Sequence, residues 1–135
     1  MDNLIAKADT LLEALPYVQR FRGETFVIKY GGSFMDSTDS AVRGGVARDV
    51  VFIEAVGINP IIVHGGGKAI TRALEQAGVE TRFEQGYRVT TPKSVEVVEQ
   101  VLSREINPGI VGMINELGGK ARGFSGTEIF CCKPF

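Results

Sequence analysis

The chain has 135 residues, a mass of 14.6 kDa and a formal net charge of −1 from 15 basic and 16 acidic residues. Apolar residues make up 44% and charged residues 23%, the balance of one ordinary globular domain. No apolar run reaches the ~18 residues of a membrane span, the first residues lack the order of a secretory signal, and no basic tract favours nucleic acid. We therefore expect a cytoplasmic protein that binds neither membrane nor nucleic acid.

The first predicted element is an amphipathic helix over residues 2–15, which Pro16 ends or kinks. Its apolar face either packs on the chain's own core or leaves the domain and packs on a neighbour, and composition leaves both possibilities open. The helical spacing that defines this face is carried by Leu4, Ile5, Ala8, Leu11, Leu12 and Leu15.

The next elements alternate between short apolar runs and helical patterns. Residues 25–30 predict a buried strand that ends in a glycine turn at Gly31 and Gly32, and residues 41–56 predict a helix. Residues 61–63 predict a second strand, followed by the turn Gly65 to Gly67 and a helix over about 67–77. This order indicates an α/β fold with a three-layer α-β-α arrangement around a mainly parallel open sheet, which is incomplete with so few strands.

The last third of the chain is less regular. Residues 83–91 are expected to be extended and polar. A long helix begins at Thr91-Pro92 and runs toward Leu117, and the Asn-Pro-Gly sequence at 107–109 predicts a kink or two helices. Residues 127–132 predict a strand. Its adjacent Cys131 and Cys132 are expected to be reduced thiols, and with one histidine in the chain no metal site is predicted.

Both glycine turns follow predicted strands, which is where open α/β sheets bind their ligands. Glycine lets backbone N–H groups approach an anion, and the helix that follows adds its positive end. Neither a Walker A loop nor a dinucleotide fingerprint fits, because Ala69 follows Gly67-Lys68 and Ile70 stands where the third glycine belongs. Two such turns after consecutive strands predict chemistry on an anion.

Three side chains near these turns are candidates for function. Lys29 lies inside an apolar strand, where it either aims its ammonium at phosphate oxygens or faces solvent on an edge strand. His64 is either a base or, the interpretation we favour, a packing or hydrogen-bonding residue. Arg88 either holds a carboxylate through two parallel hydrogen bonds or pairs at the surface with Glu84 or Glu96.

The segments VIKYGG (27–32), IVHGGG (62–67) and GYRVT (86–90) occur in this order, and IVGMIN (110–115) ends the long helix. Together they resemble the amino-acid kinase family, most closely its members that act on N-acetyl-L-glutamate. The resemblance implies transfer of a phosphoryl group from ATP, as its Mg²⁺ complex, to the γ-carboxylate of N-acetyl-L-glutamate in arginine biosynthesis. The product would be N-acetyl-L-glutamyl 5-phosphate.

The resemblance also implies a role for each matching residue. Lys29 would stabilise the moving phosphoryl group, and Arg88 would hold the α-carboxylate of the acylated amino acid. Backbone groups would line the transfer site at Gly31, Gly32, Gly65 and Gly66, and Gly65, Gly66 and Gly67 would also contact the substrate. The match covers only about the first half of the family's length, so the nucleotide half is missing and this chain alone is expected to be inactive.

Residues 1–20 are expected to be a helical extension and 21–135 the amino-terminal, substrate-binding part of the kinase domain. Arginine-inhibited members of the family carry an extra N-terminal helix that links dimers into a hexamer, and residues 2–15 resemble it. This implies a homo-oligomer with L-arginine as effector. Two alternatives stay open: a non-catalytic module that binds an acylated amino acid, and a family member with another acidic substrate.

Overall fold

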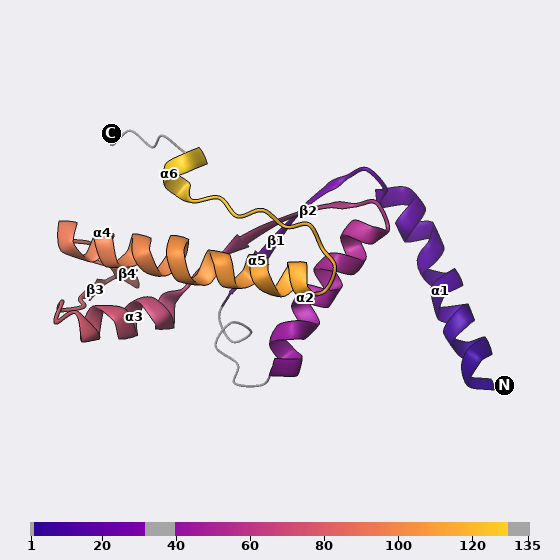
Figure 1. The fold of residues 1–135 in the computed structure, drawn as a ribbon, viewed down its shortest axis with the longest axis horizontal. Helices are drawn as coiled ribbons and strands as arrows, with labels where there is room; N and C mark the ends of the chain where they lie inside the picture. Colours follow the sequence, from indigo (N-terminus) through magenta and orange to yellow (C-terminus); the bar gives the residue numbers. More distant parts are fainter. Residues whose placement is uncertain (1, 32–39, 130–135) are drawn as a thin grey trace.

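The computed structural model describes residues 2–31 and 40–129 (Figure 1). The chain forms two small sheets and a series of helices. In order they are α1 (Asp2–Phe21), β1 (Thr25–Tyr30), α2 (Ser40–Ala55), β2 (Asn59–His64), α3 (Gly67–Gln76), β3 (Phe83–Glu84), β4 (Tyr87–Arg88), α4 (Pro92–Glu99), the π-helical segment η1 (Gln100–Ile106), α5 (Asn107–Glu116) and α6 (Gly126–Ile129). No helix among the described residues is both long and apolar enough to cross a membrane.

The central feature is the parallel pair β1 and β2, which α2 connects. The pairing runs in register from Thr25 opposite Asn59 to Tyr30 opposite His64. The predicted mixed α/β fold with a parallel sheet is therefore confirmed. Both strands end at the same edge of the sheet, so the segments after Tyr30 and His64 begin side by side.

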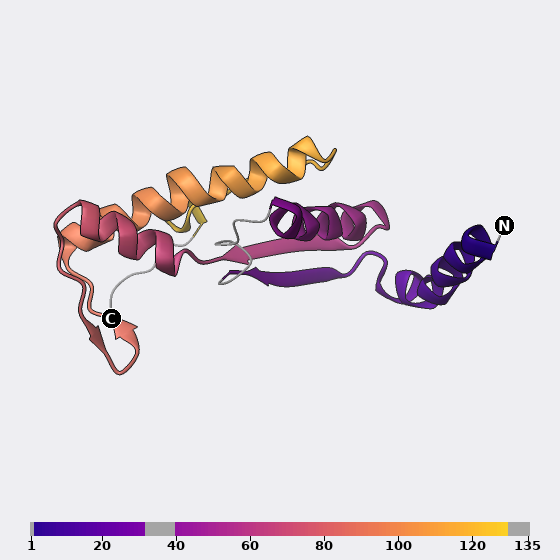
Figure 2. The ribbon, with the colours of Figure 1, turned by 90° about the horizontal axis from the view of Figure 1, so that it is seen from below.

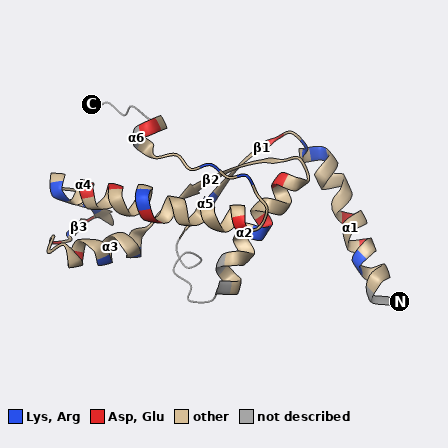
Figure 3. Cartoon of the chain, in the orientation of Figure 1, with Lys and Arg blue, Asp and Glu red and all other residues tan. Residues whose placement is uncertain are grey.

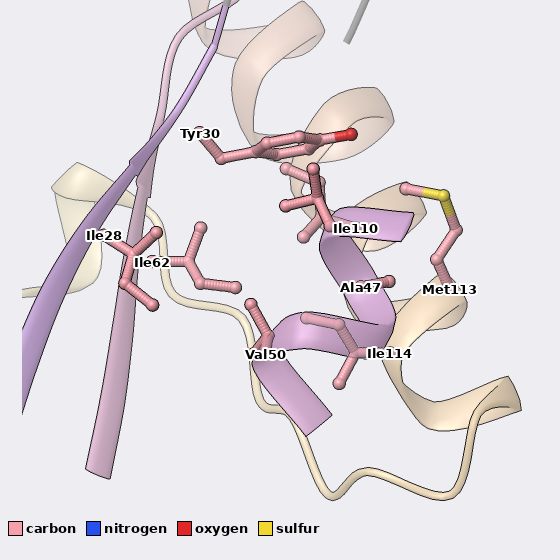
Figure 4. Close-up of a pocket in the computed structure, with 9 residues that line it drawn as sticks. Ile28, Tyr30, Ala47, Val50, Ile62, Ile110, Met113 and Ile114 are labelled. Atoms are coloured by element: carbon pink, nitrogen blue, oxygen red, sulfur yellow. The ribbon is translucent and has the colours of Figure 1, made fainter. Parts of the chain in front are cut away.

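One face of this sheet carries the core. Alternation along the strands points Ile28, Tyr30 and Ile62 toward α2 and α5, where they surround an apolar cavity of about 10 Å³ (Figure 4). The helical side of this core is formed by Ala47, Val50, Ile110 and Ile114. A cavity of this size holds at most about one water and is no substrate pocket.

The opposite face of the sheet is open in the part of the chain that the structure describes (Figure 2). Val27, Ile61 and Val63 point to it and are 69%, 51% and 52% exposed. The three-layer arrangement expected from the sequence is thus seen as helices on one face only. The sheet is therefore incomplete among the described residues, as expected from so few strands.

A second cluster joins α3 to the long helix. Ile70 and Leu74 of α3 pack against Val101 of η1, and Leu74 is 1% exposed. Ile106 packs against this cluster and also against the sheet core. The long helix therefore carries both clusters and fixes the position of α3 relative to the sheet.

The helix ends follow local sequence signals. Thr91 caps α4, where its hydroxyl accepts from the Ser94 N–H and the Ser94 hydroxyl accepts from the Thr91 N–H. Gly57 and Gly78 follow the last turns of α2 and α3, and their φ angles of 89° and 64° favour glycine. In each case the next residue's N–H reaches five residues back, as in a Schellman motif, which satisfies the last carbonyls.

The long helix is interrupted as the sequence predicts, and the interruption is π-helical. The Asn107 N–H donates to the Leu102 carbonyl, five residues back. Pro108 has no N–H and its ring crowds the carbonyl of residue 104, so the preceding turn widens instead of continuing as α-helix.

Two predictions about local structure need correction. Of the two outcomes expected at Pro16, an end to the first helix is wrong, because the helix continues to Phe21 with Pro16 inside it. The predicted strand over 127–132 is also wrong where the structure describes it, because α6 contains residues 127–129. Ser125 immediately precedes α6, and its N–H donates to Glu128 Oε2 at 2.7 Å, a local cap that outweighs the β-preference of the sequence. Cys131 and Cys132 lie outside the described residues.

Candidate functional site

The two glycine turns meet at the carboxyl edge of the parallel sheet. A Cβ built on Gly31 would lie 4.0 Å from the Gly65 nitrogen. The Gly65 N–H itself donates to the Tyr30 carbonyl at 3.4 Å. The structure therefore brings the ends of β1 and β2 together as expected, while Gly32 lies outside the described residues.

The turn after β2 is fixed by packing as well as by its own conformation. A Cβ on Gly66 would lie 2.5 Å from Ile106 Cδ1 and 3.0 Å from Leu102 Cδ2. Both contacts come from side-chain ends of the π-helical segment, which would have to shift to admit a Cβ at this position. Gly66 caps the amino end of α3, and Gly67 is the first residue of the helix, where N–H groups have no intrahelical partner.

Arg88 is half-buried and lies against α3. Its Nη2 donates to Thr71 Oγ1 at 2.8 Å, its Nη1 donates to Thr81 Oγ1 at 3.4 Å, and its guanidinium lies 4.8 Å from the centre of the Phe83 ring. The Thr71 hydroxyl in turn donates to the Gly67 carbonyl at 2.9 Å. Arg88 is thus tied through one threonine to the residue that ends the second glycine turn.

Of the two carboxylates considered as surface partners of Arg88, Glu84 pairs with another arginine. Glu84 pairs with Arg82 at 2.7 Å, and both side chains are largely exposed. Arg88 belongs to the hairpin β3–β4, whose two-residue turn has positive φ at Gln85 and Gly86. An open hollow of about 570 Å³ beside this hairpin is lined by Glu84, Gln85, Tyr87, Arg88 and Val89.

Lys29 is exposed in this chain and not buried. It alternates with Ile28 and Tyr30, so its side chain lies on the open face of the sheet, next to Val63 in the paired strand. The burial considered in the sequence is therefore not observed, because no described element covers that face. Lys29 lies two residues before Gly31, on the strand that leads into the first glycine turn.

His64 is a hydrogen-bonding residue, as favoured from the sequence. Its Nδ1 lies 3.3 Å from the Gly65 carbonyl and its Nε2 lies 3.2 Å from Asn107 Nδ2. Asn107 also donates to the Phe124 carbonyl at 3.2 Å. The sequence pattern identifies Asn107 only as part of a helix break. The signal that could have indicated a hydrogen-bonding role is the position of its amide beside the helix interruption.

Charges elsewhere are dispersed. Basic and acidic residues are interspersed along the described helices without gathering on one of them (Figure 3). Among the described residues, no group of three or more His, Cys, Asp or Glu side chains could hold a metal ion. At the end of the described chain, the hydrogen bond from the Ser125 N–H lowers the pKa of the Glu128 carboxyl below its ordinary value.

Residues 24–133 match the amino acid kinase family, so the chain belongs to that family. Within it, the chain is 52% identical to an acetylglutamate kinase of Akkermansia muciniphila over 94% of this chain and 42% of that protein. It is 53% identical to the acetylglutamate kinase of Sphingopyxis alaskensis over 95% of this chain and 42% of that protein. The chain spans less than half the length of these relatives.

Solved structures agree on the fold. The N-acetylglutamate synthase of Neisseria gonorrhoeae, crystallised with coenzyme A and L-arginine, aligns with a TM-score of 0.58 at 23% identity, over 84% of this chain and 25% of that chain. The smu.665 protein of Streptococcus mutans UA159 aligns with a TM-score of 0.64 at 23% identity, over 74% of this chain and 39% of that chain. Both therefore support the amino acid kinase fold.

Proposed function

We propose that this chain supplies the substrate-binding and phosphoryl-transfer part of an acetylglutamate kinase. In that reaction a γ-carboxylate oxygen of N-acetyl-L-glutamate attacks the γ-phosphorus of ATP. The bond between the γ-phosphorus and the β,γ-bridging oxygen breaks, ADP departs, and an acyl phosphate is formed. The observation that carries the proposal is the approach of Gly31, after β1, to the turn after β2: a Cβ built on Gly31 would lie 4.0 Å from the Gly65 nitrogen. The relatives more than 50% identical support the choice of substrate.

Phosphoryl transfer depends on positioning and on neutralising charge rather than on covalent chemistry by the protein. Backbone N–H groups at the two turns and the start of α3 suit phosphate oxygens. Lys29 would bring a cation to the same edge of the sheet. Mg²⁺ would accompany the nucleotide as a complex with its phosphates.

Arg88 would hold the α-carboxylate of the acylated amino acid. Its fork of donors is already oriented by Thr71, Thr81 and the ring of Phe83, so little side-chain freedom is lost on binding. The open hollow beside the hairpin provides room for a small acid next to this guanidinium.

Self-association and arginine control belong to the same proposal. The apolar side chains of α1 face solvent, with Leu4, Leu11 and Leu12 at 72%, 66% and 64% exposed. Helix α1 projects away from the sheet (Figure 1). An apolar helix face of this kind fits contact with a second copy of the protein, with L-arginine as the effector of the assembled enzyme.

The test is a kinase assay on a version extended to the length of the relatives. Lys29→Met is expected to lower kcat by about 10²–10³-fold, because a charge at the moving phosphoryl group is removed. Arg88→Lys is expected to raise KM for N-acetyl-L-glutamate by about 10–100-fold, because the paired hydrogen bonds to a carboxylate are lost. Arg82→Lys, on the same hairpin, is the control and should change neither constant.

The same assay separates the alternatives. The 135-residue chain alone is expected to show no turnover. Preference for aspartate, glutamate or UMP by the extended version would assign another substrate. Calorimetric binding of N-acetyl-L-glutamate to a version that never turns over would instead indicate a regulatory module.

A further inference from the structure

A chain of hydrogen bonds links the second glycine turn to the start of α5. It runs from the Phe124 carbonyl to Asn107 Nδ2, from Asn107 Nδ2 to His64 Nε2, and from His64 Nδ1 to the Gly65 carbonyl. The heavy-atom distances are 3.2, 3.2 and 3.3 Å. These contacts tie together segments that are more than forty residues apart in sequence.

The carbonyl groups at the two ends of this series of hydrogen bonds determine which atoms in it carry protons. A carbonyl only accepts, so the Gly65 carbonyl requires the proton of a neutral His64 on Nδ1. Nε2 must then accept, and its partner must donate. The Phe124 carbonyl independently requires the amide nitrogen of Asn107 at that position, so both carbonyls lead to the same assignment.

The hydrogen bond at Gly65 also orients the next peptide group. In a trans peptide the C=O and the following N–H point in opposite directions. When His64 holds the Gly65 carbonyl, the Gly66 N–H lies in the same peptide plane and points to the opposite side of the C–N bond, away from the imidazole. That N–H lies at the amino end of α3, where the helix favours an anion.

We propose that Asn107 is a positioning residue of the phosphoryl-transfer site. It fixes His64 as the Nδ1–H tautomer, and His64 holds the Gly65 carbonyl so that the Gly66 N–H is presented to an anion. Binding of an anion at the Gly66 N–H rests on the proposed function, whereas the assignment of the His64 tautomer does not.

Packing around Asn107 restricts its side chain to this role. A Cβ on Gly123 would overlap Asn107 Oδ1 and would lie 3.2 Å from Val111 Cγ2, so the chain crosses directly over the amide. The amide therefore lies where the chain at Gly123 passes close to α5.

The first experiment uses the 135-residue chain, in which His64 is the only histidine. Long-range ¹H–¹⁵N correlation spectra, recorded above the titration range of histidine, report which ring nitrogen carries the proton. We expect Nδ1–H in the unmodified chain and loss of that tautomer in Asn107→Asp, because a carboxylate can only accept and favours a proton on Nε2. An Nε2–H tautomer in the unmodified chain overturns the proposal without any variant.

Asn115→Asp is the matched control. Asn115 lies on the same helix and clamps the same segment through Ala121, at 3.3 Å to its carbonyl and 2.7 Å from its N–H, without touching His64. It carries the same change of charge and should keep the Nδ1–H tautomer. Equal loss of the tautomer in both variants would mean that the tautomer of the His64 ring responds to a general loosening of the segment and not to the link between Asn107 and His64.

The second experiment adds inorganic pyrophosphate and follows the Gly66 amide signal. We expect a shift on binding, with affinity at least about tenfold weaker in Asn107→Asp than in Asn115→Asp, because one oriented donor to a charged group is lost. An unchanged affinity overturns the positioning role. No response at Gly66 in a chain with the Nδ1–H tautomer also overturns the proposal, but it does so by removing the anion site and with it the proposed function.

Discussion

Gly66 illustrates how one position serves both packing and chemistry. Its backbone caps α3 at the candidate site, and its missing side chain makes room for Ile106 and Leu102. A Cβ added at either neighbour, Gly65 or Gly67, would meet nothing within 4 Å, so their place in the turn is not set by crowding. Neighbouring glycines that look alike in sequence are therefore distinct in structure.

We predict that Gly66→Ala lowers the stability of the chain by about 1–3 kcal/mol, because two packed methyl groups must move. Gly65→Ala should change stability by less than about 0.5 kcal/mol, since its side chain enters open space. Chemical denaturation of both variants measures the difference. Equal stability of the two would contradict the close packing of the π-helical segment on the turn.

At the scale of elements, regular spacing and caps made much of the fold predictable. The two parallel strands, the crossover helix, the glycine-ended helices and the Thr91 cap follow from local patterns, and each is confirmed. The helix end expected at Pro16 is wrong, because a proline costs a helix most where the freed carbonyl is buried. The exposed α1 leaves that carbonyl to water.

The remaining errors have equally specific causes. A hydrophobic run near the end suggested a strand, but Ser125 and Glu128 have the spacing of a capping box and start a helix. The meeting of the glycine turns followed from parallel pairing alone. The links from Asn107 to His64 and from Thr71 to Arg88 did not, because they join segments whose approach depends on tertiary packing.

For α1 we predict that the exposed leucines mediate assembly. In a version extended to the length of the relatives, Leu11→Glu with Leu12→Glu, or removal of residues 1–20, should reduce the oligomer seen by sedimentation or size exclusion. The reason is that burying an apolar leucine stabilises a contact by roughly 1.5–3 kcal/mol, which a carboxylate reverses. Glu13→Lys on the same helix is the control, and oligomers that survive the deletion would reject a role for α1.

At the scale of the whole molecule, the open face of the sheet is the main departure from an ordinary α/β domain. Its apolar side chains come from both strands, whereas the other face is packed with α2 and α5. The relatives are more than twice as long as this chain, and their additional length is available to cover such a face.

We predict that the 135-residue chain binds a hydrophobic dye through this face. Replacing Val27, Ile61 and Val63 together by threonine should reduce dye binding while changing stability little, because all three are at least half exposed. Ile62→Thr, on the packed face of the same strand, should instead cost about 1–3 kcal/mol. Thermal unfolding combined with dye fluorescence distinguishes the triple variant from Ile62→Thr. Undiminished dye binding in the triple variant would mean that the dye binds another surface.

The widened turn of η1 sets the angular phase between the two ends of the long helix. Each residue of an α-helix advances the chain by about 100° around the axis, so one residue more or less rotates everything beyond it by that amount. Shortening 100–106 by a single residue would turn Asn107, Ile110 and Ile114 away from the strands they meet while leaving α4 seated on α3. An insertion or deletion here would therefore rotate α5 relative to α4, and not merely change the length of the helix. Keeping the site requires a fixed number of residues in this segment.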